Sequence, residues 1–253
     1  MRVNQTKAKL LAGQSVYGCF IRSADANLAE LIAGLGFDFL VFDAEHGTIE
    51  PRDCESLVRA AELRGVSPFI RVTSNTAPVI LRFADTGTQG IQVPWVNSVE
   101  DAERAVQAVK YSPRGTRGLA TTRAADFGQK GTIAEYVAQA NAETVVIAQI
   151  EGREAVEQVP DIARVEGIDV IFIGPTDLSN SLGHPGNPAH PEVQAAMDRI
   201  IAGVNGTDAA LGIFVSNAQD ARAWRERGAR YIATSLEPIL SGAIRNYLDT
   251  VHG

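Results

Sequence analysis

The chain has 253 residues, of which 45% are hydrophobic and 21% charged, and its formal net charge is −7. This length suits two small domains or one α/β barrel of roughly 250 residues. The composition predicts a soluble globular protein, because no apolar stretch is long enough to span a bilayer. The negative charge, without a dense block of lysines and arginines, argues against nucleic acid or an anionic membrane as the main partner.

The cysteine content bears on the cellular compartment. Cys19 and Cys54 are too few for a disulfide framework, which indicates a reducing environment. The basic segment over residues 1–13 contains an apolar run that is too short for a signal peptide. We therefore expect a cytoplasmic protein.

Short β-branched runs alternate with amphipathic stretches along the whole chain. Eight runs predict strands, over residues 16–21, 39–43, 67–72, 90–96, 144–151, 169–174, 210–216 and 231–235. The runs are apolar throughout, which favours parallel strands covered on both faces. Because there are eight β/α units, no flexible linker and no shift in composition, the sequence predicts a single α/β domain over residues 1–253, a (β/α)8 TIM barrel.

Helices are predicted between these strands. Residues 51–63 and 98–110 each place a stripe of apolar residues on one face, as a helix packed on a core requires. A last helix over residues 238–251 is apolar enough to pack on its own barrel or on that of a neighbour. The longest interruption, over residues 111–143, is rich in Gly, Thr and Arg, and we interpret it as a functional loop.

Polar side chains follow four of the predicted strands at the point where each strand ends. In a TIM barrel the ligand binds at the C-terminal ends of the strands. We therefore expect a shared rim formed by Asp43, His46, Arg71, Gln149, Glu151 and Asp177.

Glu151 and Asp177 are candidate metal ligands. Two carboxylates on adjacent strands, without a Cys or His cluster, suit a hard octahedral ion such as Mg²⁺ or Mn²⁺. The alternative is that each carboxylate caps the helix that follows it.

Arg71, Asp43 and His46 are candidates for catalysis. The Arg71 guanidinium can supply a permanent positive charge for a carboxylate or a developing enolate, or it can form an ion pair with a neighbouring strand end. An Asp43 carboxylate that fixes the tautomer of His46 would make this imidazole a general base near neutral pH. The alternative for His46 is a partly buried structural histidine.

Several other residues are not assigned to catalysis. His184 and His190 lie in a proline-rich loop, and we interpret both as structural. Trp95 and Phe20 lie in strands or at their ends, where aromatic residues usually belong to the core. All four lysines lie outside the predicted strands, which argues against a Schiff-base mechanism.

The motifs together resemble the HpcH/HpaI family, the divalent-metal (class II) pyruvate aldolases, which include 4-hydroxy-2-oxoheptanedioate and 2-dehydro-3-deoxyglucarate aldolases. The resemblance covers residues 15–240 approximately. It is carried by FDFLVFDAEHGTIEPRD, PFIRV, GIQVPWVNSVEDAERAVQAVKYSPRGTRGL, AQIEGREAVEQV, IFIGPTDLSNSLGHPGNPAHPEV and ERGARYIATS.

The resemblance implies a role for each residue of the rim. Glu151 and Asp177 would bind Mg²⁺, Mn²⁺ or Co²⁺. Arg71 and Gln149 would contact pyruvate, and His46 with Asp43 would form an acid/base dyad. Backbone N–H groups at Gly174, Thr176 and Asp177 would hold the pyruvate carboxylate. Glu45 would pair with the charged residues around it without binding the metal itself.

The implied reaction is the reversible cleavage of 4-hydroxy-2-oxo acids to pyruvate and an aldehyde through a metal-stabilised pyruvate enolate. The implied partners are a small oxo-acid and an aldehyde, and the implied assembly is a trimer or hexamer with a domain-swapped C-terminal helix. This chain has Phe20 where a Trp is common, and its stretch 234–238 also departs from the family. Both differences lie closer to the expected position of the aldehyde than to that of the metal, so they bear on which aldehyde the enzyme uses.

Two other functions stay open on the sequence. The first is an acyl-CoA lyase of the citrate lyase β or malyl-CoA lyase type, for which Arg114, Arg117 and Arg123 would form a basic rim. The second is a barrel without catalytic activity that binds an oxo-acid or serves as a scaffold.

Overall fold

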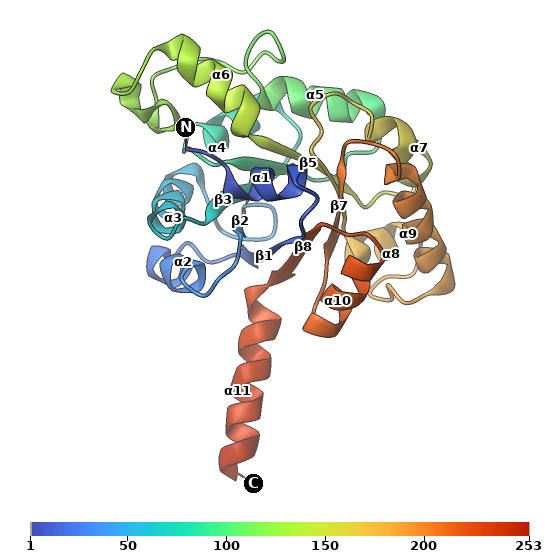
Figure 1. Cartoon of the computed structure of the whole chain (residues 1–253). Coiled ribbons are helices and arrows are strands. Elements are labelled where there is room, and N and C mark those ends of the chain that lie inside the picture. Colours follow the sequence, from blue (N-terminus) through green and yellow to red (C-terminus); the bar gives the residue numbers. More distant parts are fainter. Residues whose placement is uncertain (1, 253) are drawn as a thin grey trace.

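Eight parallel strands close into a barrel in the computed structural model, which describes residues 2–252 (Figure 1). The strands are β1 (Val16–Ile21), β2 (Phe39–Asp43), β3 (Ser67–Arg71), β4 (Gly90–Val93), β5 (Val145–Ile150), β6 (Val170–Ile173), β7 (Ala210–Phe214) and β8 (Tyr231–Ser235). β8 pairs with β1 in parallel, which closes the sheet. The predicted (β/α)8 architecture is therefore confirmed; residues 1 and 253 of the predicted domain lie outside the described part.

Helices surround the barrel (Figure 1). None of those in the described part is long and apolar enough to cross a membrane. They are α1 (Gln5–Leu11), α2 (Ala26–Ala33), α3 (Pro51–Leu63), α4 (Ala77–Ala84), α5 (Val99–Val109), the 3-10 helix η1 (Arg123–Gly128), α6 (Ile133–Glu143), α7 (Ala155–Ile162), α8 (Pro175–Ser181), α9 (Pro191–Val204), α10 (Ala218–Glu226) and α11 (Leu236–His252).

Two predicted boundaries are wrong for identifiable reasons. β4 ends at Val93 and not at residue 96, because Pro94 has no N–H to donate and Trp95 adopts a left-handed φ of 53°. The segment 111–143 is not a loop throughout. It contains η1 and α6, and α6 begins with a capping box between Thr132 and Glu135.

Stacked aromatic rings fill the N-terminal half of the barrel. The Tyr231 ring lies 4.2 Å from that of Phe39, and the Phe69 ring lies 5.4 Å from Phe39 and 6.2 Å from Tyr231. Gly18 makes room for this stack, because a Cβ there would lie 2.0 Å from the Phe39 ring. With this end packed, polar side chains gather at the opposite end of the strands.

The C-terminal helix α11 projects away from the barrel (Figure 1). Within the described part, Leu236 is its only buried residue. Its apolar side chains are exposed, namely those of Ile239, Leu240, Ile244, Tyr247, Leu248 and Val251. The predicted helix is present, and it does not pack on its own barrel.

Candidate active site

A buried ion pair links β2 to β3 at the mouth of the barrel. Arg71 lies opposite Asp43 in the strand register. Its Nε donates to Asp43 Oδ1 at 2.9 Å and its Nη2 to Oδ2 at 2.7 Å. Burial alone would raise the pKa of Asp43, but the hydrogen bonds and charge of Arg71 outweigh it and hold the pKa below its usual range. Asp43 therefore stays ionised.

Asp43 also shapes the loop that carries His46. Its Oδ1 accepts hydrogen bonds from the backbone N–H groups of Glu45 and His46, both at 3.2 Å. No hydrogen bond joins the Asp43 carboxylate to the His46 ring in the described part of the chain. The expected contact with the imidazole is thus replaced by contacts with the backbone, because Arg71 occupies the carboxylate.

Glu45 is the acid that lies nearest to the His46 ring. Its Oε2 lies 4.0 Å from His46 Nε2 and 3.2 Å from Arg71 Nη1. This oxygen is buried and has no hydrogen bond. Burial raises the pKa of Glu45, although Arg71 and His46 oppose the shift. Glu45 therefore lies between the Arg71 guanidinium and the His46 imidazole.

Two glutamines hold Glu151 through a chain of amides. Gln92 Nε2 donates to Gln149 Oε1, and Gln149 Nε2 donates to Glu151 Oε2. The backbone N–H of Trp95 donates to Glu151 Oε1 at 2.9 Å. The sequence prediction did not include Gln92, although a lone amide in the apolar strand GIQV could have indicated a buried polar contact. Nothing in the sequence indicated the left-handed conformation of Trp95.

The carboxylates of Glu151 and Asp177 fit a divalent cation. Burial raises the pKa of Glu151 to about 7, the hydrogen bond from Gln149 opposes this, and the charges of Glu45 and Asp177 add to it. A Cβ at Gly174 would lie 2.8 Å from Glu151 Oε2, so glycine keeps the space beside this oxygen open. Crowded carboxylate oxygens with open space suit Mg²⁺ or Mn²⁺.

One cavity of about 190 Å³ brings most of the predicted residues together, whereas Asp43 and Glu151 are buried and are not part of its lining. Its polar lining includes Arg22, His46, Arg71, Gln149, Thr176 and Asp177, and its apolar wall consists of Phe20, Phe172 and Phe214. The Phe20 ring lies 6.0 Å from each of the other two phenylalanine rings. Phe20 is therefore both a core residue, as predicted, and a wall of the cavity.

The backbone N–H groups that are expected to contact pyruvate differ in their partners within the fold. The Gly174 N–H donates to the Ile150 carbonyl at 3.3 Å, so it is already bonded within the fold. Thr176 and Asp177 lie in the first turn of α8, where N–H groups have no partner within the helix. The predicted contacts at Gly174, Thr176 and Asp177 all stay predictions, and the three residues line the same cavity.

His184, His190 and Glu192 form a separate group with the donor types of a metal site, their nearest ligand atoms within 4.8 Å of one another. The two rings stack with centroids 3.4 Å apart and planes 17° apart. An imidazole binds a metal in its own ring plane, so two stacked rings do not aim at one ion. His184 pairs with Glu192, and His190 caps α9. Their arrangement fits the structural role predicted for them.

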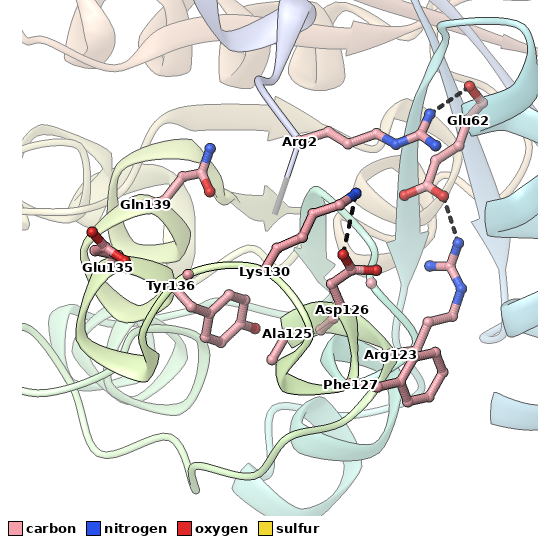
Figure 2. A pocket seen from close by; sticks show the side chains of 13 residues that line it. Arg2, Glu62, Arg123, Ala125, Asp126, Phe127, Lys130, Glu135, Tyr136 and Gln139 are labelled. Carbon is pink, nitrogen blue, oxygen red and sulfur yellow. Dashed lines mark hydrogen bonds and ion pairs between the residues drawn. The ribbon is translucent and has the colours of Figure 1, made fainter.

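A larger cavity, of about 510 Å³, lies at the other end of the barrel, among segments that precede strands (Figure 2). Four of its charged side chains form two ion pairs. Arg123 pairs with Glu62, and Lys130 lies 3.2 Å from Asp126 (Figure 2). Two other charged residues of this lining are in no ion pair among the described residues: Arg2 donates to the Glu62 backbone carbonyl, and Glu135 caps α6.

The arginines considered for a CoA rim belong to that end as well. Arg114 pairs with Glu166 at 2.9 Å, and the buried Arg117 pairs with Asp85 at 2.8 Å. Arg123 is held by Glu62 and by the Thr86 carbonyl. In this chain the three side chains do not surround the mouth that holds Glu151.

The chain is similar to known proteins along nearly its whole length. It is 37% identical to a 4-hydroxy-2-oxo-heptane-1,7-dioate aldolase of Escherichia coli over 94% of this chain and 90% of that protein. It is 38% identical to a hydroxypyruvate/pyruvate aldolase of Sagittula stellata, over 92% of each chain. The crystal structure of an HpcH/HpaI aldolase/citrate lyase family protein from Burkholderia cenocepacia superposes with a TM-score of 0.94 at 34% identity, over 99% of this chain and 100% of that one.

The family model for HpcH/HpaI aldolase/citrate lyase matches residues 16–239, which span the barrel from its first strand to the start of α11. The predicted resemblance is thus confirmed, and with it the enzyme class, a carbon–carbon lyase. This chain belongs to the HpcH/HpaI aldolase/citrate lyase family.

Proposed function

We propose that the protein is a divalent-metal-dependent aldolase that reversibly cleaves 4-hydroxy-2-oxo acids to pyruvate and an aldehyde. The observation that carries the proposal is a cavity at the C-terminal ends of the strands, where His46, Arg71, Gln149 and Asp177 share one lining. One barrel domain carries this activity.

The residues of β5 and α8 hold the pyruvate half of the substrate. Glu151 and Asp177 would hold the metal, which when bound supplies a Lewis acid for the keto oxygen. Gln149 offers an amide to the same end of the substrate, and the first-turn N–H groups of Thr176 and Asp177 face its carboxylate. Arg71 places a fixed positive charge where the enolate oxygen develops.

His46 is the general base on the aldehyde side of the substrate. In the cleavage direction it accepts the proton of the 4-hydroxyl while the C3–C4 bond breaks, and the bonding electron pair passes to C3 of the pyruvate enolate. Protonation of C3 then gives pyruvate. Asp43 supports this step by fixing the His46 backbone and the Arg71 guanidinium, both of which it contacts directly.

The test is the metal dependence of pyruvate release. Protein stripped with a chelator should lose pyruvate release from 4-hydroxy-2-oxo acids and regain it with Mg²⁺, Mn²⁺ or Co²⁺. Full activity without metal would refute the proposal. Cleavage of CoA esters with no reaction on free oxo-acids would instead identify an acyl-CoA lyase, and binding without any turnover would identify a non-catalytic barrel.

We also propose that the protein assembles into a trimer or hexamer in which α11 is exchanged between subunits. The exposed apolar residues of α11 support this, as does α10, which has no fully buried residue and is free to accept a partner's helix. Deletion of residues 237–253 should then reduce the mass measured by light scattering to that of a monomer. An unchanged mass would contradict the exchange.

Cellular fractionation would test the proposed cytoplasmic location. The buried and unpaired thiols of Cys19 and Cys54 support a reducing compartment.

A further inference from the structure

Arg22 is a second guanidinium at the cavity that the proposed mechanism does not use. Arg71 is almost fully buried, and its three nitrogens face Asp43 and Glu45. The Arg22 side chain is 39% exposed and makes one hydrogen bond, from Nε to Asp43 Oδ2 at 3.2 Å. Arg22 therefore retains donors that a ligand can use.

The position of Arg22 in the barrel separates it from the pyruvate-binding groups. Arg22 follows β1, whose neighbours are β2 and β8. The groups assigned to pyruvate follow β5 and β6, and β5 lies across the closed barrel from β1. His46, which faces the 4-hydroxyl in the proposed reaction, follows β2 beside Arg22. A substrate anchored at β5 and β6 therefore extends past His46 toward Arg22.

Glu237 is the nearest competing anion for the free end of Arg22. Its Oε1 lies 3.6 Å from Arg22 Nη1, which is longer than a hydrogen bond, and its side chain is 49% exposed. An exposed ion pair of this kind is weak. A carboxylate of the substrate can replace it, and two oxygens of one carboxylate match the planar donors of a guanidinium.

We propose that Arg22 is a specificity-determining residue that binds a carboxylate at the far end of the aldehyde portion, and that Glu237 competes with that carboxylate. The inference rests on the proposed aldolase function. It means that the charge at the far end of the aldehyde, more than its size, decides how well the enzyme uses it.

The experiment compares two aldehydes of nearly equal shape in the synthetic direction with pyruvate. Succinic semialdehyde ends in a carboxylate, and 4-methylpentanal replaces the two carboxylate oxygens by methyl groups. The wild type should prefer the anion by roughly tenfold or more in kcat/KM, because only the anion forms a charge-assisted hydrogen bond. A change at Arg22 that acts through Asp43 alters kcat/KM for both aldehydes equally, so it leaves the ratio of the two kcat/KM values unchanged.

Three variants decide the outcome. Arg22→Gln should bring the ratio close to one, Arg22→Lys should retain part of the preference, and Glu237→Gln should lower KM for the anion alone. Arg59→Gln is the matched control, because it removes a cation from an exposed surface pair with Glu55. A ratio that Arg22→Gln leaves unchanged, or a wild type without preference, would overturn the inference.

A measurement without aldehyde separates the two proposals. Wild-type protein with metal and pyruvate in D₂O should exchange the C3 protons of pyruvate, since this step needs only enolate formation. Absence of exchange would mean that the proposed function itself fails. Exchange in the wild type together with an unchanged aldehyde ratio in Arg22→Gln would refute only the role of Arg22.

Discussion

Arg71 and Asp43 form two parallel hydrogen bonds across β2 and β3, at 2.9 and 2.7 Å, in a site from which nearly all solvent is excluded. The pair fixes the direction of the guanidinium, and the same carboxylate fixes the backbone of His46. One buried carboxylate thus sets the relative position of the two groups to which we assign enolate stabilisation and proton transfer, Arg71 and His46.

Replacement of Arg71 by Lys should show that a point charge does not substitute for the guanidinium. An ammonium lacks the planar set of nitrogens with which the guanidinium contacts both Asp43 oxygens and Glu45. We expect kcat for aldol cleavage to fall by about 10²-fold or more, with a lower melting temperature because a buried carboxylate loses a partner. Arg59→Lys, in an exposed pair with Glu55, is the control and should change neither value.

Replacement of His46 by Ala should remove the proton-transfer group and spare the metal ligands. We expect pyruvate release to fall by about 10²- to 10⁴-fold, with metal content by elemental analysis unchanged. His190→Ala is the control, since His190 caps α9 and its loss should cost about 1 kcal/mol of stability without affecting turnover. Wild-type turnover in His46→Ala would exclude this histidine as the base.

Replacement of Gly174 by Ala should close the space beside Glu151. The new Cβ would lie 2.8 Å from Glu151 Oε2 and 3.4 Å from Gln149 Nε2. We expect weaker metal binding by titration calorimetry and a loss of activity, while circular dichroism stays native. In the control Gly34→Ala, a Cβ at the end of α2 would meet only ordinary contacts of 3.4 Å and more, so its metal affinity should match the wild type.

The stability of the metal-free protein should depend on pH through Glu151. Its pKa is raised from 4.5 to about 7, so the folded state holds this proton more tightly than the unfolded state. The stabilisation is complete below pH 4.5 and is lost as the pH rises toward and through 7. At about 1.4 kcal/mol per pKa unit, the loss is on the order of 3 kcal/mol.

Glu151→Gln isolates this effect, because Gln does not titrate. The free energy of unfolding of the wild type, relative to this variant, should decrease between pH 5 and pH 8 in the presence of a chelator. Divalent metal should restore it at the high end of this range, since the ion binds the ionised carboxylate. Parallel pH profiles of the two proteins would contradict the raised pKa.

Much of the fold was predictable because the strands are buried on both faces. Mainly apolar runs such as FLVFD and YIATS, each ending in a polar residue, indicate where a strand begins and ends, and β2 and β8 match the predicted residues throughout. The ends of β4 and of the segment 111–143 were not predictable in the same way. The end of β4 depends on the left-handed conformation of Trp95. The positions of η1 and α6 depend on packing, because their sequences have no strong apolar period.

Most residues of the candidate site were predictable, except Arg22 and Gln92, and their contacts were less so. Strand ends place Arg71, Gln149 and Asp177 at one cavity, as the barrel architecture requires. Which oxygen faces which donor depends on competition between neighbours. Arg71 takes the Asp43 carboxylate that was expected to orient the imidazole, and the Ile150 carbonyl takes the Gly174 N–H that was expected to face pyruvate.

The isolated position of α11 has a consequence for its own folding. A helix of 17 residues that buries only Leu236 lacks the apolar contacts that normally stabilise a helix of this length in water. If subunits exchange α11, coil-to-helix conversion over residues 237–252 and subunit association become one equilibrium. Dilution should then lower the helical signal before the barrel unfolds, and the protomer concentration should govern how much of this segment is ordered.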